Sequence, residues 1–203
     1  MTLKKLELLV ATSNPGKIRE LEDLLQDLPI ALHGLREFPH LADVEETGAT
    51  FAENAILKAR AYAGETGLYA LSDDSGLAVD ALGGAPGVYS ARYGGPGATD
   101  EDRIGKLLGE LEMIGGDRAA QFVCVMALAA PTGTIVRVEE GVCRGAIARA
   151  PRGANGFGYD PVFVPAGYDE TFGELSVDVK RRISHRALAA GKIMAFLRNF
   201  TVQ

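Results

Sequence analysis

Apolar positions along the chain fall into short continuous runs and into sets at helical spacing. The run over 6–11 predicts a short buried strand. A helix is predicted after it by apolar residues that recur on one face: Ile18, Leu21, Leu25 and Leu28. Ser13 or Asn14 is a suitable N-cap for this helix, with Pro15 at its first position. The chain therefore opens with strand, polar loop and helix.

The same reasoning predicts the later elements. They are a strand over 30–35, a helix from the capping box at Thr50 to about residue 63, a strand carrying Asp73 and Asp74, a helix over about 99–111, a hairpin over 119–149, a short strand over 162–164 and a last helix over about 184–200. This order predicts an α/β fold of the mixed α+β kind, with an antiparallel component in the middle of the chain.

Composition narrows the class of protein. The chain has 203 residues, a net charge of −6 and a pI near 5.2, so its overall field disfavours nucleic acid and anionic membrane surfaces. No stretch approaches the roughly 20 apolar residues of a membrane span. The start of the chain does not resemble a signal peptide, and the two cysteines, Cys124 and Cys143, lie in strand-like segments and fit reduced thiols. We therefore expect a cytoplasmic protein.

The most informative stretch is 70–79, where apolar residues lead to Asp73 and Asp74 and a Ser-Gly pair follows. We expect the strand to end at the two acids and a turn to begin at Ser75. Adjacent carboxylates repel each other unless a cation or a basic group lies beside them, and oxygen ligands suit Mg²⁺. The alternative is an ordinary polar junction between a strand and a turn.

Several motifs together resemble the inosine/xanthosine triphosphate pyrophosphatase family over nearly the whole chain. In order they are 12–17 (TSNPGK), 45–48 (EETG) leading into 51–55 (FAENA), 72–77 (SDDSGL), 86–93 (PGVYSARY), 156–161 (GFGYDP), Lys180 and 184–186 (SHR). No single motif is specific, but their order and spacing are.

The resemblance implies one domain over 1–203, with an elongated mixed sheet flanked by helices and two lobes around a central cleft. It implies that the protein forms a homodimer. It also implies Mg²⁺-dependent hydrolysis of ITP, dITP and XTP to the monophosphate and pyrophosphate. The order of preference among the three substrates stays open.

The resemblance also assigns the phosphate and metal residues. The loop that opens the first helix would bind phosphate through free backbone N–H groups and a lysine: Thr12, Ser13, Asn14, Pro15, Gly16 and Lys17. Mg²⁺ would lie on Glu45 and Asp74, with Asp74 also accepting a proton from the attacking water. Ser75 would donate to a phosphate or sugar oxygen. Whether Glu45 or Glu46 is the ligand stays open, and a simple turn with a solvated lysine is the alternative for the loop.

The remaining motifs would bind the nucleoside. These residues are Phe157, Gly158, Tyr159, Asp160, His185 and Arg186, while Lys180 would hold the phosphates together with Lys17. An aromatic ring can stack on a purine, and donors from His185 or Arg186 would match the oxygen at position six of hypoxanthine or xanthine but not the amino group of adenine. Guanine carries the same oxygen, so its rejection is not explained. The alternatives are core aromatics beside a glycine turn, and basic residues on a wet helix face.

Two other functions fit parts of the pattern. One is a pyrophosphatase for ordinary or modified pyrimidine nucleotides on a related fold. The other is a regulator that binds a nucleotide without hydrolysing it, although clustered carboxylates are of little use to a protein that only binds polyphosphate. Measured preference among the bases distinguishes the first alternative from a purine pyrophosphatase. Turnover with Mg²⁺, as opposed to binding without turnover, distinguishes the second.

Overall fold

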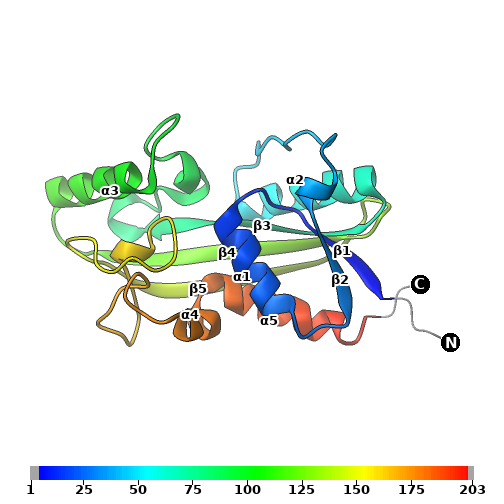
Figure 1. Cartoon of the computed structure of the whole chain (residues 1–203). Coiled ribbons are helices and arrows are strands. Elements are labelled where there is room, and N and C mark those ends of the chain that lie inside the picture. Colours follow the sequence, from blue (N-terminus) through cyan, green and yellow to red (C-terminus); the bar gives the residue numbers. More distant parts are fainter. Residues whose placement is uncertain (1–4, 201–203) are drawn as a thin grey trace. The chain divides into compact units, whose positions relative to one another are not determined.

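The computed structural model describes residues 5–200 and contains a mixed sheet with helices on it (Figure 1). The elements are β1 (Leu6–Val10), α1 (Pro15–Leu25), β2 (Ile30–Gly34), α2 (Phe51–Thr66), β3 (Tyr69–Val79), α3 (Asp100–Ile114), β4 (Ala119–Ala129), β5 (Ile135–Ile147), β6 (Phe163–Pro165), α4 (Val177–Ile183) and α5 (His185–Leu197), with short 3-10 turns between some of them. The six strands lie in the order β2-β1-β3-β4-β5-β6. β1 is parallel to β2 and β3, whereas β5 and β6 are antiparallel. The predicted mixed α/β class is confirmed.

Contacts divide the chain into two compact units. Unit 1 contains 1–74, 124–141 and 188–203, and unit 2 contains 75–123 and 142–187. The strands β3, β4 and β5 each contribute residues to both units. The assignment of 1–203 to one domain with two lobes stays a prediction, and each unit is described by itself below.

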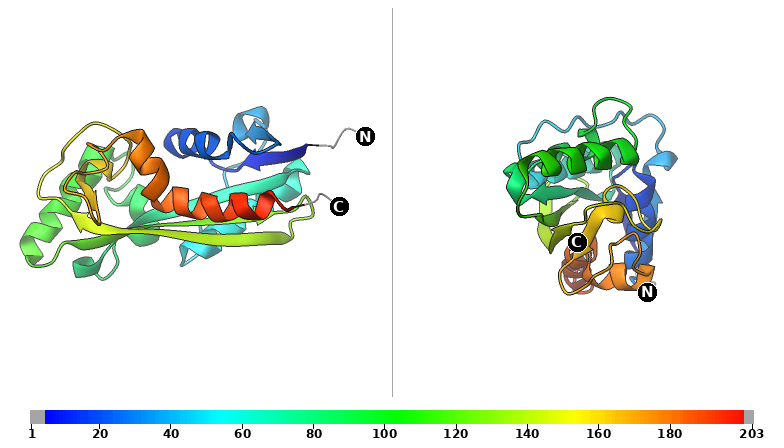
Figure 2. Two further views of the ribbon diagram at one scale, coloured as in Figure 1. Left: turned by 90° about the horizontal axis from the view of Figure 1, so that it is seen from below. Right: turned by 90° about the vertical axis from the view of Figure 1, so that its left-hand side faces the viewer.

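In unit 1 both faces of the sheet are covered. Leu8 and Leu9 point to opposite faces of β1, and both are fully buried. One face packs into a cluster with Leu21 and Leu25 of α1 and Ile193 of α5. The blue and red helices in Figure 2 are these two elements. This packing fixes the start of α1 at the carboxyl end of β1.

Unit 2 has a second apolar core, which is rich in aromatic rings. Phe163 and Phe172 stack at 5.5 Å between ring centroids, and Phe122 lies 4.5 Å from Phe163. The helix α3 contributes Ile104 and Leu107 to the same cluster. The core therefore holds α3 firmly against the strands of this unit.

The local helix signals are confirmed. Asn14 is the N-cap of α1 with Pro15 at the first position, and Thr50 forms the predicted capping box with Glu53. The helix α2 runs past the predicted end and stops at Gly67, whose φ of +69° is the left-handed conformation that glycine adopts readily. Caps were predictable because they depend on neighbours in sequence.

One expectation about longer range order was wrong. The strand β3 does not end at the acids but continues without a turn to Val79, since it lies between β1 and β4 and basic side chains pair with its carboxylates. The last helix is confirmed, since α5 begins directly after Ser184, whose extended ψ of 153° separates it from α4, a short helix that was not predicted.

Candidate active site

The loop that opens α1 does not offer the free backbone donors expected of it. The N–H groups of Gly16 and Lys17 donate to Asn14 Oδ1 at 2.8 and 3.1 Å, and the N–H of Ile18 donates to the Asn14 carbonyl. The cap thus satisfies the first donors of the helix. A phosphate at this loop would meet the hydroxyls of Thr12 and Ser13 and the Lys17 ammonium, unless it displaced the Asn14 side chain.

Lys17 is directed to β3. Its Nζ lies 2.6 Å from Asp73 Oδ1 and 3.4 Å from the Asp73 carbonyl oxygen. The Asp73 side chain has no exposed surface, and the Cys124 thiol donates to its other oxygen at 3.1 Å. Asp73 therefore holds Lys17 in place. A buried carboxylate with these contacts is well suited to positioning a cation and poorly suited to meeting a substrate.

A second lysine joins the remaining acids. Lys58 Nζ donates to Glu46 Oε1 at 2.7 Å, to Asp74 Oδ1 at 2.9 Å and to the Asp73 carbonyl at 3.0 Å. Lys58 was not among the predicted site residues. Its signal in the sequence was its position on α2, three and four residues after the buried Ala55 and Asn54 and so on the same inward face.

The charges in this cluster shift each other's pKa. Burial alone would lower the pKa of Lys58, but Asp74 and Glu46 outweigh it and the pKa is raised. Burial raises the pKa of Asp74, and the positive charges of Lys58 and Lys17 offset part of that rise. Lys58 thus stays charged, and Asp74 becomes a somewhat stronger base than an exposed aspartate.

The two neighbouring glutamates differ in their environment. Glu46 is half-buried and paired with Lys58, whereas Glu45 is exposed. Within residues 5–200 no group of three or more histidine, cysteine or acidic side chains is placed to hold a metal ion. Two carboxylates are nevertheless the number that Mg²⁺ commonly takes from a protein when phosphates complete its shell. The donor set of Glu46 and Asp74 therefore fits that ion, and the assignment to Glu45 stays a prediction.

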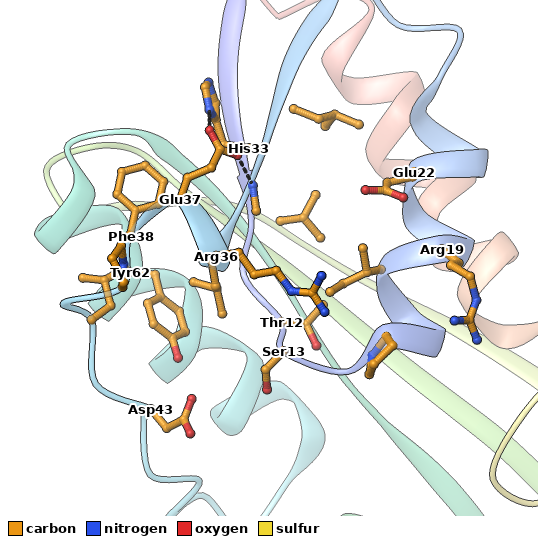
Figure 3. A pocket seen from close by; sticks show the side chains of 18 residues that line it. Thr12, Ser13, Arg19, Glu22, His33, Arg36, Glu37, Phe38, Asp43 and Tyr62 are labelled. Carbon is orange, nitrogen blue, oxygen red and sulfur yellow. Dashed lines mark hydrogen bonds and ion pairs between the residues drawn. The ribbon is translucent and has the colours of Figure 1, made fainter.

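A pocket of about 640 Å³ lies beside the loop within unit 1 (Figure 3). Thr12 and Ser13 line it together with Arg36, Phe38 and Tyr62. In Figure 3 the Arg36 guanidinium points to the part of the pocket that the Thr12 hydroxyl faces. This side of the loop thus offers a guanidinium and two hydroxyls to an anionic group.

In unit 2 the segment 156–160 presents one aromatic ring and buries another. Tyr159 is 4% exposed and donates its hydroxyl to the Ser90 carbonyl at 2.9 Å, so it is a core residue, as the alternative interpretation held. Phe157 is only half-buried. Lys180 Nζ and Arg186 Cζ lie 5.0 and 5.7 Å from the centroid of its ring. Phe157 is therefore the aromatic residue of this segment that can meet a ligand.

Asp160 and Lys180 form a buried ion pair. Lys180 Nζ lies 2.5 Å from Asp160 Oδ2, which also accepts the N–H of Phe157 at 2.8 Å. A Cβ at Gly156 would come within 1.9 Å of the same oxygen, so only glycine fits there. Asp160 thus fixes both the turn and the lysine.

The basic residues at the start of α5 are buried rather than wet. His185 is 5% exposed and stacks on Phe122 at 4.7 Å with an angle of 12° between the rings. Arg186 is 1% exposed and donates from Nη2 to the Ser75 hydroxyl at 2.9 Å. The interpretation as a solvated helix face is therefore wrong. A buried guanidinium is costly unless its donors have partners, and the Ser75 hydroxyl is one such partner.

The structure thus gathers the predicted residues into two groups. One is in unit 1: the loop 12–17, Glu46 and the Asp73–Asp74 pair, with Lys58 added. The other is in unit 2: Ser75, Phe157–Asp160, Lys180, His185 and Arg186. Their roles toward a substrate stay predictions.

Comparison with known proteins gives one consistent result. Residues 8–196 match the family model described as Ham1 family. A relative from Synechocystis sp. that is named dITP/XTP pyrophosphatase is 49% identical over 187 residues, which are 92% of this chain and 93% of the relative. One from Streptomyces avermitilis with the same name is 49% identical over 194 residues, 94% of this chain and 96% of the relative. The structure of a HAM1 protein from Coxiella burnetii has a TM-score of 0.89 and 46% identity, covering 96% of this chain and all of that one.

Proposed function

Because the chain belongs to the Ham1 family, we propose that it hydrolyses the deaminated purine nucleoside triphosphates ITP, dITP and XTP to the monophosphate and pyrophosphate. The resemblance that the motifs indicated is confirmed by the family match and by relatives named dITP/XTP pyrophosphatase. These names favour purine substrates over the pyrimidine alternative, and hydrolysis over binding alone. The structural observation that carries the proposal is the cluster in which Lys58 joins Glu46 and Asp74.

The residues of unit 1 would bind and cleave the triphosphate. Lys17 and Lys58 carry positive charge to the phosphate oxygens, and the Thr12 and Ser13 hydroxyls orient them. Asp74, whose pKa burial raises, would accept a proton from the water that attacks the α-phosphorus. Pyrophosphate is then the leaving group. The oxygen of the water forms a bond to the α-phosphorus while the bond from that phosphorus to the oxygen of the leaving pyrophosphate breaks, and the proton of the water passes to Asp74.

Mg²⁺ is part of this proposal. When bound, the ion would supply a counter-charge to the phosphate oxygens. Asp74 and Glu46 are the carboxylates that would hold it, since Glu46 is the glutamate that shares Lys58 with Asp74. The exposed Glu45 is the weaker candidate. Comparing Glu45→Gln with Glu46→Gln in a titration of activity against Mg²⁺ decides between them, because the true ligand's variant needs more metal.

The residues of unit 2 would recognise the base. Phe157 offers a ring for stacking, while Arg186 and His185 offer donors to the oxygen at position six. The amino group at position six of adenine is itself a donor and would not match these donors, and such a mismatch in a buried site is costly. This argument separates hypoxanthine and xanthine from adenine, and it does not separate them from guanine.

A homodimer in the cytoplasm completes the proposal. No helix within residues 5–200 has the length and apolar character to cross a bilayer. Light scattering should give twice the 21.5 kDa mass of one chain. A mass of one chain at working concentration would contradict the dimer.

The experiment that tests the function is pyrophosphate release, with Mg²⁺ present, from ITP, dITP, XTP, ATP, GTP and a pyrimidine triphosphate. Strong preference for the first three supports both reaction and base discrimination. Equal rates on all six would retain the hydrolase and remove the specificity argument. Release of orthophosphate instead would place the attack on the terminal phosphate, and binding without turnover would favour the regulator.

A further inference from the structure

The turn that presents Phe157 is held by two carboxylates, one local and one distant. Asp160 accepts the Phe157 N–H from three residues away. Asp100 accepts the Gly158 N–H at 2.7 Å from 58 residues away in the sequence. The second contact ties the turn to a different element, because Asp100 is the first residue of α3.

Asp100 is well placed to act as a fixed anchor. Its other oxygen, Oδ1, lies 2.6 Å from Arg103 Nη1, so both carboxylate oxygens are engaged. The helix behind it is secured by Ile104 and Leu107, which are buried in the core of unit 2. A carboxylate fixed at both oxygens and mounted on a packed helix transmits the position of that helix to the turn.

The geometry of the turn makes this anchor consequential for Phe157. Gly158 has a φ of +60°, and a Cβ there would meet no atom within 4 Å, so glycine is needed for its conformation and not for space. The Gly158 amide follows Phe157 directly, so moving it moves the ring relative to Lys180 and Arg186. The ring face offered to a base therefore depends on this distant hydrogen bond as well as on the local one from Phe157 to Asp160.

We propose that Asp100 is a positioning residue for base binding: it fixes the Gly158 amide and through it the Phe157 ring. The proposal rests on the function proposed above. The carboxylate of Asp100 is engaged by Gly158 and Arg103, and the chemical step is assigned to other residues, so loss of Asp100 should weaken substrate binding and base selectivity and leave the rate of the chemical step nearly unchanged.

The test compares three variants. Asp100→Ala removes the acceptor, and Asp100→Asn keeps an oxygen for the Gly158 amide. Asp102→Ala is the matched control: Asp102 lies in the same turn of α3, but its carboxylate accepts the Thr99 N–H and hydroxyl and does not reach the loop. Hydrogen exchange of the 156–160 amides and the kcat and KM for ITP and ATP are measured for each.

For Asp100→Ala we expect faster exchange at Gly158, a rise of about five-fold in KM for ITP, a smaller ratio of kcat/KM for ITP over ATP, and a kcat within about two-fold of wild type. Asp100→Asn should behave almost as the wild type, because its side-chain oxygen still accepts the Gly158 N–H. Asp102→Ala should show none of these changes.

Three results would overturn the proposal. They are unchanged exchange at Gly158 in Asp100→Ala, unchanged KM despite faster exchange, and an equal rise in KM in Asp102→Ala. If the wild type hydrolysed none of the triphosphates, the proposed function would fail by itself. The dissociation constant of ITP would then replace KM in the same comparison. An unchanged dissociation constant in Asp100→Ala would overturn the proposal for Asp100 as well.

Discussion

The two units hold their charged residues in different ways. In unit 1, Lys17 and Lys58 pair with the carboxylates of Asp73, Asp74 and Glu46. In unit 2, Lys180 also pairs with an acid, Asp160, but Lys180 and Arg186 both lie over the ring of Phe157 as well. Paired acids and lysines suit an anion whose charge changes during reaction, while cations on an aromatic face suit recognition of a flat ring. This difference supports the proposal that unit 1 carries the chemistry and unit 2 selects the base.

The largest expected effect comes from removing the proposed catalytic base of unit 1. Asp74→Asn keeps the size of the side chain and an oxygen for Lys58, so the protein should fold with an unchanged circular dichroism spectrum. It cannot take up the proton of the attacking water, and kcat should fall by about a hundred-fold or more. An Asp74→Asn enzyme with near wild-type kcat would show that another group is the base.

An intermediate effect concerns the stability of unit 2. Arg186→Ala removes a buried side chain together with its hydrogen bond to Ser75 and should cost about 3 kcal/mol of unfolding free energy. Arg186→Met fills most of the volume without burying a charge, so it should cost much less. Urea unfolding of both variants measures the difference. Equal losses would mean that charge, and not volume, determines stability at this position.

The smallest effect lies in unit 1, away from the cluster. His33 bonds Glu37 through Nδ1 at 2.9 Å and Glu7 through Nε2 at 2.6 Å, and the bond to Glu37, followed by that to Glu7, raises its pKa. Because the pKa of His33 is higher in the folded than in the unfolded protein, its charge stabilises the fold fully at a pH below the unfolded pKa. This stabilisation is lost as the pH rises through the folded pKa. These side chains are partly exposed, so solvent screens the pairs.

The measurement is urea unfolding of wild type and His33→Gln between about pH 5 and 8. The stability advantage of the wild type should be largest at the acidic end and shrink as the pH rises. An advantage that is constant with pH would assign it to packing and not to the charge on His33.

Features that depend on neighbouring residues were predictable from the sequence. The caps at Asn14 and Thr50 and the fold class belong here, because spacing and local hydrogen bonding determine them. The acids on β3 were recognised as chemically important, but their place within the strand was not, since the lysines that pair with them come from other elements.

Residues that act across long separations were not predictable in the same way. Lys58 lies 16 residues from Asp74, and Asp100 lies 58 residues from Gly158, so no spacing rule connects them. Glu45 and Glu46 are neighbours of the same residue type in an irregular loop, so the sequence does not tell which side chain is exposed and which is half-buried. Burial of Arg186 was expected only through the family resemblance, because a basic residue at a helix start is usually solvated.

The central claim, that unit 1 cleaves and unit 2 selects, is tested most directly by two variants measured side by side. Rates of pyrophosphate release from ITP and from ATP are determined for Lys58→Gln and Arg186→Met. The account predicts that Lys58→Gln lowers both rates by the same factor and keeps their ratio, whereas Arg186→Met brings the two rates closer together. A changed ratio in Lys58→Gln, or an unchanged one in Arg186→Met, would contradict it.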